Sequence, residues 1–198
     1  MAQPLHTLDP AVARRIRVVA FDVDGVLTDG GVYIGGFEGT KVELKRYDIQ
    51  DNVGFRLLRD SGVKIILVSG RPSEATTLRG LELAVDHVVQ DPTATKLPIV
   101  RQLVSDLDAT LEETAFVADD LPDIPVLRRV ALPIAVANAV PEVRASAHYV
   151  TERPGGRGAA REVAEALLRT RGEWTGAVER YLEARGERSP TGVRDANG

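Results

Sequence analysis

The feature that most constrains the fold is a series of short apolar runs, rich in valine and isoleucine, separated by longer stretches with helical character. The runs are IRVVAF (16–21), VKIILVS (63–69), VDHVVQ (85–90), TAFVAD (114–119) and LPIAVAN (132–138). Short continuous apolar runs are typical of parallel strands whose two faces are both covered by helices. The sequence therefore predicts an α/β fold built on a doubly wound parallel sheet.

The segments between these runs predict the helices that cover the sheet. We expect helices at about 51–60, 73–83, 96–107, 122–130, 141–147 and 158–171. Two β-like stretches around a glycine-rich turn follow the first strand, so residues 29–47 predict a hairpin that projects from the sheet. We expect one domain over residues 1–171. The polar extension 172–198 is expected to be partly helical, because Trp174, Val178, Tyr181 and Leu182 share a helical face, and frayed from about residue 185.

Composition narrows the classes of function. A chain of 198 residues with a net charge of -4 suits one compact domain and argues against a protein devoted to binding nucleic acid. It has no cysteine, and His6, His87 and His148 are too scattered for a zinc cluster, so a metal would need oxygen ligands. No apolar run approaches the ~20 residues that span a bilayer, and the N-terminal segment lacks the apolar core of a secretory signal. We expect a cytoplasmic protein that does not bind membranes.

Polar residues with chemical potential gather where the predicted strands end. They are Asp22 and Asp24 after the first strand, Ser69, Gly70 and Arg71 after the second, Lys96 at the start of a helix, and Asp119, Asp120 and Asp123 after TAFVA. Ligands of open α/β sheets bind beyond the carboxyl ends of the strands, so these side chains are expected to meet. Two carboxylates at ~4 Å repel by ~4 kcal/mol at an effective dielectric constant of 20. A hard divalent cation such as Mg²⁺ would offset that repulsion.

At these residues the chain resembles a known family. DVDGVLTDG, SGR, a lysine that begins a helix, and DDLPD occur in the order and spacing of the haloacid dehalogenase-like phosphohydrolases. DGVLTDGGVYIG, DIQDNVGFRLL, SGRPSEATTLRGLEL and GGRGAAREV further resemble the capless 3-deoxy-D-manno-octulosonate 8-phosphate phosphatases. The resemblance implies a Rossmann-like fold without a cap domain. It also implies Mg²⁺-dependent hydrolysis of a 2-keto-3-deoxy acid sugar phosphate, with nonulosonate 9-phosphates as the alternative substrates.

The resemblance also implies a role for each residue at the strand ends. Asp22 would be the nucleophile that becomes an aspartyl phosphate, and Asp24 the general acid and base. Mg²⁺ would be held by the carboxylates of Asp22 and Asp119 and by the backbone carbonyl of Asp24. Asp120 and Asp123 would steady these ligands, Ser69 would bind a phosphate oxygen, and Lys96 would neutralise charge in the transition state.

Recognition of the sugar is implied for a wider set of residues. The set comprises Asp48, Gln50, Asp51, Asn52, Arg56, Gly70, Arg71 and Arg79. Arginine suits the carboxylate of an acid sugar because its planar fork binds two oxygens at once. Arg56 could instead pair with Asp60, and Arg79 with Glu82, at helical spacing. The chain departs from the family pattern at Ala118 and Asn52, where glycine is usual, and at Gln50, where arginine is frequent. The departures at Asn52 and Gln50 lie in the sugar-binding stretch and leave the choice of acid sugar open.

The spacing of the motifs leaves no room for a cap. Asp22 and Ser69 are 47 residues apart, and the hairpin, one helix and one strand use nearly all of them. Phosphoryl transfer benefits from a closed site, so a neighbouring subunit could supply the wall through the hairpin. The resemblance implies a homotetramer.

Two other interpretations compete with the enzyme. The acids could be turn formers and helix N-terminal residues without chemistry. A phosphoaccepting signalling domain of the receiver type also uses a doubly wound sheet, Mg²⁺ and an aspartate. The D-x-D motif at Asp22 and the D-x-x-x-D motif at Asp119 favour hydrolysis over signalling.

Overall fold

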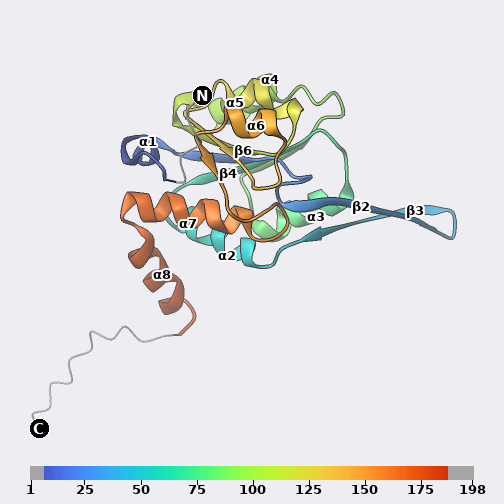
Figure 1. Cartoon of the computed structure of the whole chain (residues 1–198). Helices are drawn as coiled ribbons and strands as arrows, with labels where there is room; N and C mark the ends of the chain where they lie inside the picture. Colours follow the sequence, from blue (N-terminus) through green and yellow to red (C-terminus); the bar gives the residue numbers. More distant parts are fainter. Residues whose placement is uncertain (1–6, 187–198) are drawn as a thin grey trace, which may run out of the picture.

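A six-stranded parallel sheet forms the centre of the molecule in the computed structural model, which describes residues 7–186 (Figure 1). Its strand order is β5-β4-β1-β6-β7-β8. The strands are β1 (Val18–Phe21), β4 (Lys64–Ser69), β5 (His87–Gln90), β6 (Thr114–Ala118), β7 (Leu132–Ala135) and β8 (Tyr149–Val150). The first five correspond to the predicted apolar runs, so the predicted doubly wound α/β fold is confirmed.

Helices cover both faces of this sheet. They are α1 (Pro10–Arg15), α2 (Gln50–Asp60), α3 (Glu74–Leu83), α4 (Lys96–Asp106), α5 (Ile124–Leu127), α6 (Pro141–Ser146), α7 (Ala159–Arg171) and α8 (Trp174–Glu183), with short 3₁₀ turns at Leu111–Glu113 and Leu121–Asp123. Helices α4, α5 and α6 lie on one side, whereas α2, α3 and α7 lie on the other, and α8 leads away from α7 (Figure 1). None of the helices in the described residues is long and apolar enough to cross a membrane.

The core lies between these layers and explains why the central strands are apolar throughout. All four residues of β1 and all five of β6 are buried, because each strand has a neighbour on both sides and helices on both faces. The ring of Phe21 packs on that of Phe55 from α2, with centroids 4.9 Å apart. This packing fixes the strand ends, which carry the polar residues.

The predicted hairpin is present as β2 (Thr28–Phe37) and β3 (Thr40–Tyr47), which pair with each other and extend from the body (Figure 1). Its tip passes through Glu38 and Gly39, both with positive φ, as two-residue hairpin loops require. The pairs Tyr33 with Leu44 and Gly35 with Val42 share one face of the ribbon. On that face Tyr33, Val42 and Leu44 are exposed.

Three elements differ from the sequence-based expectation. Helix α1 was missed because it spans six residues, although Asp9 caps it and Pro10 opens it. Strand β8 has only two residues, too few for a recognisable pattern. The predicted helix 122–130 is a 3₁₀ turn followed by the single turn α5. Residues Trp174–Glu183 of the extension form α8, with Trp174 and Tyr181 packed on the core and Leu182 exposed, whereas the segment expected to fray lies mostly outside the described residues.

Candidate active site

Four strand ends converge on one cavity at the carboxyl edge of the sheet. Asp22 follows β1, Ser69 ends β4, Lys96 begins α4 after β5, and Asp119 follows β6. The cavity measures about 190 Å³ and is lined by Asp22, Asp24, Ser69, Gly70, Arg71, Ala94, Lys96, Asp119, Asp120, Pro122 and Asp123. The predicted convergence of the catalytic and metal-binding candidates is therefore found in the structure.

Lys96 joins two carboxylates on the floor of this cavity. Its Nζ lies 2.7 Å from Asp22 Oδ1 and 2.6 Å from Asp123 Oδ1. All three side chains are buried, with 5% of Lys96 exposed. Burial opposes the charge on the lysine, but the two carboxylates outweigh it and raise the pKa of Lys96 above its ordinary value. Lys96 is therefore held as a cation beside Asp22, which also accepts the backbone N–H of Val23.

One lysine does not balance the acids around it. Asp22, Asp119 and Asp123 each offer a carboxylate oxygen, and these oxygens lie within 4.8 Å of one another. Asp119 Oδ1 and Asp123 Oδ2 are buried without a hydrogen-bond partner. Burial, followed by the charge of Asp22, raises the pKa of Asp119 to about 8 and that of Asp123 to about 7. Three carboxylates this close together, two of which have a buried oxygen without a partner, fit a hard cation such as Mg²⁺.

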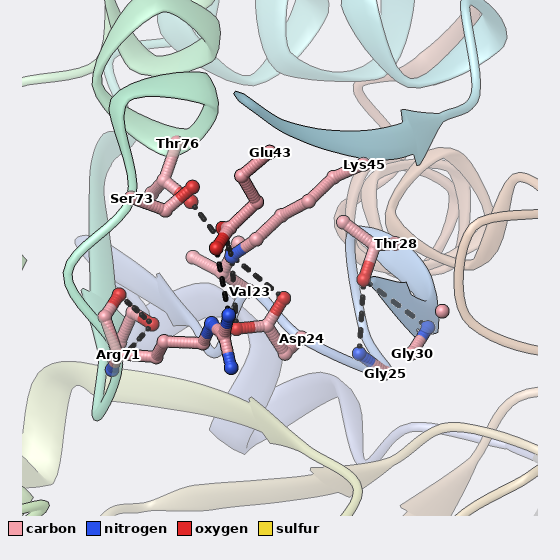
Figure 2. Close-up of polar contacts among 12 residues, drawn as sticks. Val23, Asp24, Gly25, Thr28, Gly30, Glu43, Lys45, Arg71, Ser73 and Thr76 are labelled. Carbon is pink, nitrogen blue, oxygen red and sulfur yellow. Dashed lines mark hydrogen bonds and ion pairs between the residues drawn. The ribbon is translucent and has the colours of Figure 1, made fainter. Parts of the chain in front are cut away.

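The loop after β1 approaches this cluster closely because it contains glycine. Gly25 has φ of +85°, and a Cβ at this position would lie 1.9 Å from Asp119 Oδ2. The same loop packs against the GGRG segment, where a Cβ on Gly155 would lie 1.8 Å from the carbonyl oxygen of Gly25. Asn138 bridges the two segments, donating to Gly25 O and accepting from Gly155 N. Thr28 closes the loop by accepting the N–H groups of Gly25 and Gly30 (Figure 2).

The other two predicted catalytic residues also line the cavity, one buried and one partly exposed. Ser69 is 2% exposed, and its hydroxyl bonds to the backbone of Arg71 in a local turn. The Asp24 side chain is 27% exposed and pairs with Lys45 of β3. Asp120 lies on the outer wall, where its carboxylate accepts the N–H of Leu121.

The structure brings two of the predicted sugar-binding residues to the cavity, Gly70 and Arg71. The other six do not line it: Asp48, Gln50, Asp51, Asn52, Arg56 and Arg79. Arg56 pairs with Asp60, and Arg79 pairs with Glu82 and donates to the carbonyl of Asp48. These are the two ion pairs that helical spacing offers as the alternative to sugar binding by these arginines.

The remaining polar residues of this stretch are likewise engaged within the chain. Asp51 is 1% exposed and accepts the N–H of Arg161 in the first turn of α7. Gln50 accepts from Arg153, and Asn52 donates to Glu82. A contact of these residues with a sugar stays a prediction.

Sequence reasoning missed two charged residues of β3, Glu43 and Lys45. Glu43 Oε2 lies 2.6 Å from Arg71 Nη2, and Lys45 reaches Asp24 (Figure 2). Alternation along KVELKRY places Glu43, Lys45 and Tyr47 on one face of the strand. That signal was readable, but it does not tell which face folds over the cavity.

Comparison with known proteins places this geometry among phosphatases. A model of the haloacid dehalogenase-like hydrolases matches residues 85–162. The chain is 38% identical to the 3-deoxy-D-manno-octulosonate 8-phosphate phosphatase KdsC of Yersinia pestis over 166 residues, which cover 84% of this chain and 87% of the relative. The KdsC protein of Escherichia coli K12 is also 38% identical, over 82% of this chain and 85% of the relative.

Solved structures agree with these relatives. The 3-deoxy-D-manno-octulosonate 8-phosphate phosphatase of Moraxella catarrhalis, in complex with magnesium, phosphate and KDO, is 33% identical with a TM-score of 0.81, covering 87% of this chain and 97% of that chain. A probable yrbi family phosphatase of Pseudomonas syringae is 39% identical with a TM-score of 0.80, covering 87% of this chain and 96% of that chain.

Proposed function

Because the chain belongs to the 3-deoxy-D-manno-octulosonate 8-phosphate phosphatase family of haloacid dehalogenase-like hydrolases, we propose that its cavity removes the 8-phosphate with Asp22 as the nucleophile. The chain is thus a phosphatase rather than a signalling domain. The observation that carries the proposal is the meeting of Asp22, Lys96 and the acids after β6 at one point.

Asp22 is suited to attack phosphorus. Its carboxylate follows β1 directly and is held by the Val23 N–H and by Lys96, so its position is fixed. Attack forms the bond from Asp22 oxygen to phosphorus while the bond from phosphorus to the sugar oxygen breaks. The product is an aspartyl phosphate, from which water then releases inorganic phosphate and restores Asp22.

Asp24 is proposed to manage the protons of both steps. It would give a proton to the departing sugar oxygen, and then take one from the water that attacks the aspartyl phosphate. Its carboxylate lines the same cavity as that of Asp22, two residues away on the loop after β1. Lys96 and the Ser69 hydroxyl are proposed to bind the phosphoryl oxygens as they become more negative.

The buried acids are proposed to hold Mg²⁺, through the carboxylates of Asp22 and Asp119 and the backbone carbonyl of Asp24. Asp123 would orient these ligands while paired with Lys96. When bound, Mg²⁺ neutralises the carboxylates and the substrate phosphate together, so that an anion can approach an anion. The unpartnered oxygens of Asp119 and Asp123 support this assignment.

The substrate follows from the family and from Arg71. The curated relatives and the Moraxella catarrhalis structure are named for 3-deoxy-D-manno-octulosonate 8-phosphate, which favours this acid sugar over nonulosonate 9-phosphates. Arg71 is the arginine at the cavity, and its planar guanidinium suits the carboxylate of such a substrate.

A phosphate-release panel tests the proposal. Wild-type protein with Mg²⁺ would be compared on 3-deoxy-D-manno-octulosonate 8-phosphate, nonulosonate 9-phosphates, hexose phosphates and nucleotides. We expect the highest kcat/KM on the first, and no turnover by Asp22→Asn, which keeps the shape but not the nucleophile. Higher activity on a nonulosonate phosphate would favour the alternative substrate. Turnover by Asp22→Asn would contradict the mechanism.

The homotetramer and the cytoplasmic location stay predictions. Tyr33 and Leu44 on the hairpin are each 62% exposed, and such an apolar face supports self-association. A second subunit placed there could wall a cavity that this chain leaves open. Sedimentation would show a tetramer if the prediction holds, and Leu44→Glu should weaken it. A monomer at working concentration would contradict it. Cell fractionation tests the location.

A further inference from the structure

Lys45 is a buried cation that the proposed chemistry does not use. It lies on β3 of the hairpin, and its side chain is fully buried. Lys41, which precedes it by four residues on the same strand, is 67% exposed. Burying a lysine costs both solvation and side-chain entropy, so its position must be compensated by specific contacts.

Those contacts converge on Asp24. Lys45 Nζ lies 2.8 Å from Asp24 Oδ1 and donates to Asp24 Oδ2 at 3.0 Å, so it meets both oxygens of the carboxylate (Figure 2). Within residues 7–186, no other residue forms a hydrogen bond or an ion pair with that carboxylate. The orientation of Asp24 in the cavity therefore depends on Lys45.

The ammonium group is itself held in place. Lys45 Nζ donates to Thr76 Oγ1 on α3 at 3.2 Å, and the Thr76 hydroxyl also meets the Tyr47 hydroxyl at 3.3 Å. Thr76 is fully buried. Glu43 Oε1 lies 4.0 Å from the same Nζ and adds a second negative charge. The lysine is thus fixed from the hairpin and from α3 before it reaches Asp24.

We propose that Lys45 is a positioning residue for Asp24, holding its carboxylate in the orientation from which it serves the departing sugar oxygen. The inference rests on the proposed function, because it requires Asp24 to be the proton donor. One hydrogen bond to Oδ2, together with the 2.8 Å ion-pair contact to Oδ1, holds the carboxylate against the hairpin and limits its rotation. The hairpin therefore contributes to the chemistry from within its own chain, in addition to any contact with a neighbouring subunit.

The choice of leaving group separates this role from a structural one. A sugar alkoxide needs a proton as it departs, whereas p-nitrophenolate departs without one at neutral pH. Lys45→Met keeps the length and the apolar stem but removes the charge. We expect its kcat on the sugar phosphate to fall about 10- to 100-fold, part of the 10²–10⁴-fold that general acid catalysis provides. On p-nitrophenyl phosphate we expect kcat to change less than about threefold, because no proton is required.

Three further variants sharpen the test. Lys45→Arg should restore part of the loss, since the cation returns. In an Asp24→Asn background, Lys45→Met should cost nothing more on the sugar phosphate, because residues that act as a unit are not additive. Lys41→Met removes an exposed lysine from the same strand and should behave as wild type on both substrates.

Each outcome supports or overturns the inference. An equal loss on both substrates, or none, would overturn it, as would an additive loss in the Asp24→Asn background. Circular dichroism and Tm identify a variant that fails to fold. In that case Thr76→Val, which removes one contact of the ammonium, should show a smaller loss confined to the sugar phosphate, and an equal loss on both substrates would again overturn the inference. If wild-type protein hydrolyses neither substrate, the proposed function fails instead.

Discussion

Arg71 and Glu43 face each other at the mouth of the cavity, with Nη2 of the arginine 2.6 Å from Oε2 of the glutamate. The arginine comes from the loop after β4, and the glutamate comes from the hairpin. The hydrogen bond from Arg71 lowers the pKa of Glu43, so the glutamate stays ionised at neutral pH. A substrate carboxylate that binds Arg71 must therefore compete with Glu43.

Glu43→Gln should ease that competition. The amide keeps the shape but loses the charge, so the guanidinium becomes more available to an acid sugar. Arg71 is 41% exposed, and exposed pairs contribute about 0.2–1 kcal/mol, which corresponds to a KM lower by up to about fivefold. Steady-state kinetics would show this as a lower KM on the acid sugar phosphate. On p-nitrophenyl phosphate, which has no carboxylate, KM should not move. A higher KM for the acid sugar would show that Glu43 orients Arg71 instead.

Asp119→Asn should abolish stabilisation by Mg²⁺ while leaving the protein folded. At a hundredfold excess over Kd, a ligand stabilises by about 2.7 kcal/mol, and for a chain of this size that raises Tm by about 5–10 °C. The variant keeps the shape but removes one of three clustered acids, so its metal-free Tm should equal or exceed that of the wild type. Differential scanning calorimetry with and without Mg²⁺ measures both values.

Asp106→Asn, an exposed substitution on α4, serves as the control and should retain the Mg²⁺ response. An undiminished Tm rise in Asp119→Asn would mean that the metal binds elsewhere.

The sequence predicts those parts of the site for which the evidence lies in the residues immediately around each position. The meeting of Asp22, Ser69 and Asp119 was predictable, because each follows an apolar run and parallel strands end at one edge. The partners of Arg56 were readable as well, since Asp60 lies four residues along the same helix.

The contacts of the hairpin could not be predicted in the same way. Alternation assigns Glu43 and Lys45 to one face of β3, but the direction in which a two-stranded ribbon leaves the sheet is set by tertiary packing. Thr76 of α3, which fixes the lysine, is 31 residues away in the chain. Lysine is also rarely buried in proteins, so the residue type alone places Lys45 at the surface.

Asp51→Asn should remove a pH-dependent loss of stability. Burial is the main cause that raises the pKa of Asp51 from 3.8 to about 6; the Arg161 N–H opposes the rise, Asp48 adds to it, and Arg79 and Arg153 oppose it. A raised pKa means that the folded state binds more protons between about pH 4 and 6, so stability falls as pH rises through this window. Two units correspond to about 3 kcal/mol at most.

Urea unfolding at several pH values measures this effect as the difference between variant and wild type. Asparagine can still accept the Arg161 N–H without carrying charge, so the variant should gain relative stability from pH 4 to 6 and keep the gain at pH 7. Asp60→Asn, an exposed substitution on the same helix, should show no such trend. A difference that is constant with pH would contradict the prediction for Asp51.

Gly155→Ala should damage activity from outside the cavity. Its Cβ would lie 1.8 Å from the carbonyl oxygen of Gly25 and 2.9 Å from that of Thr28, and both neighbours are backbone atoms that cannot rotate away. The loop after β1 must then shift, and it carries Asp24. Overpacking of this kind costs about 1–3 kcal/mol, so we expect a lower Tm together with a lower kcat.

Gly176→Ala provides the matched control on α8, where the nearest atom is the flexible end of Arg180. Alanine in a helix should preserve or raise Tm. If Gly155→Ala keeps the Tm and kcat of the wild type, the close contact between Gly155 and the loop of Gly25 does not constrain that loop.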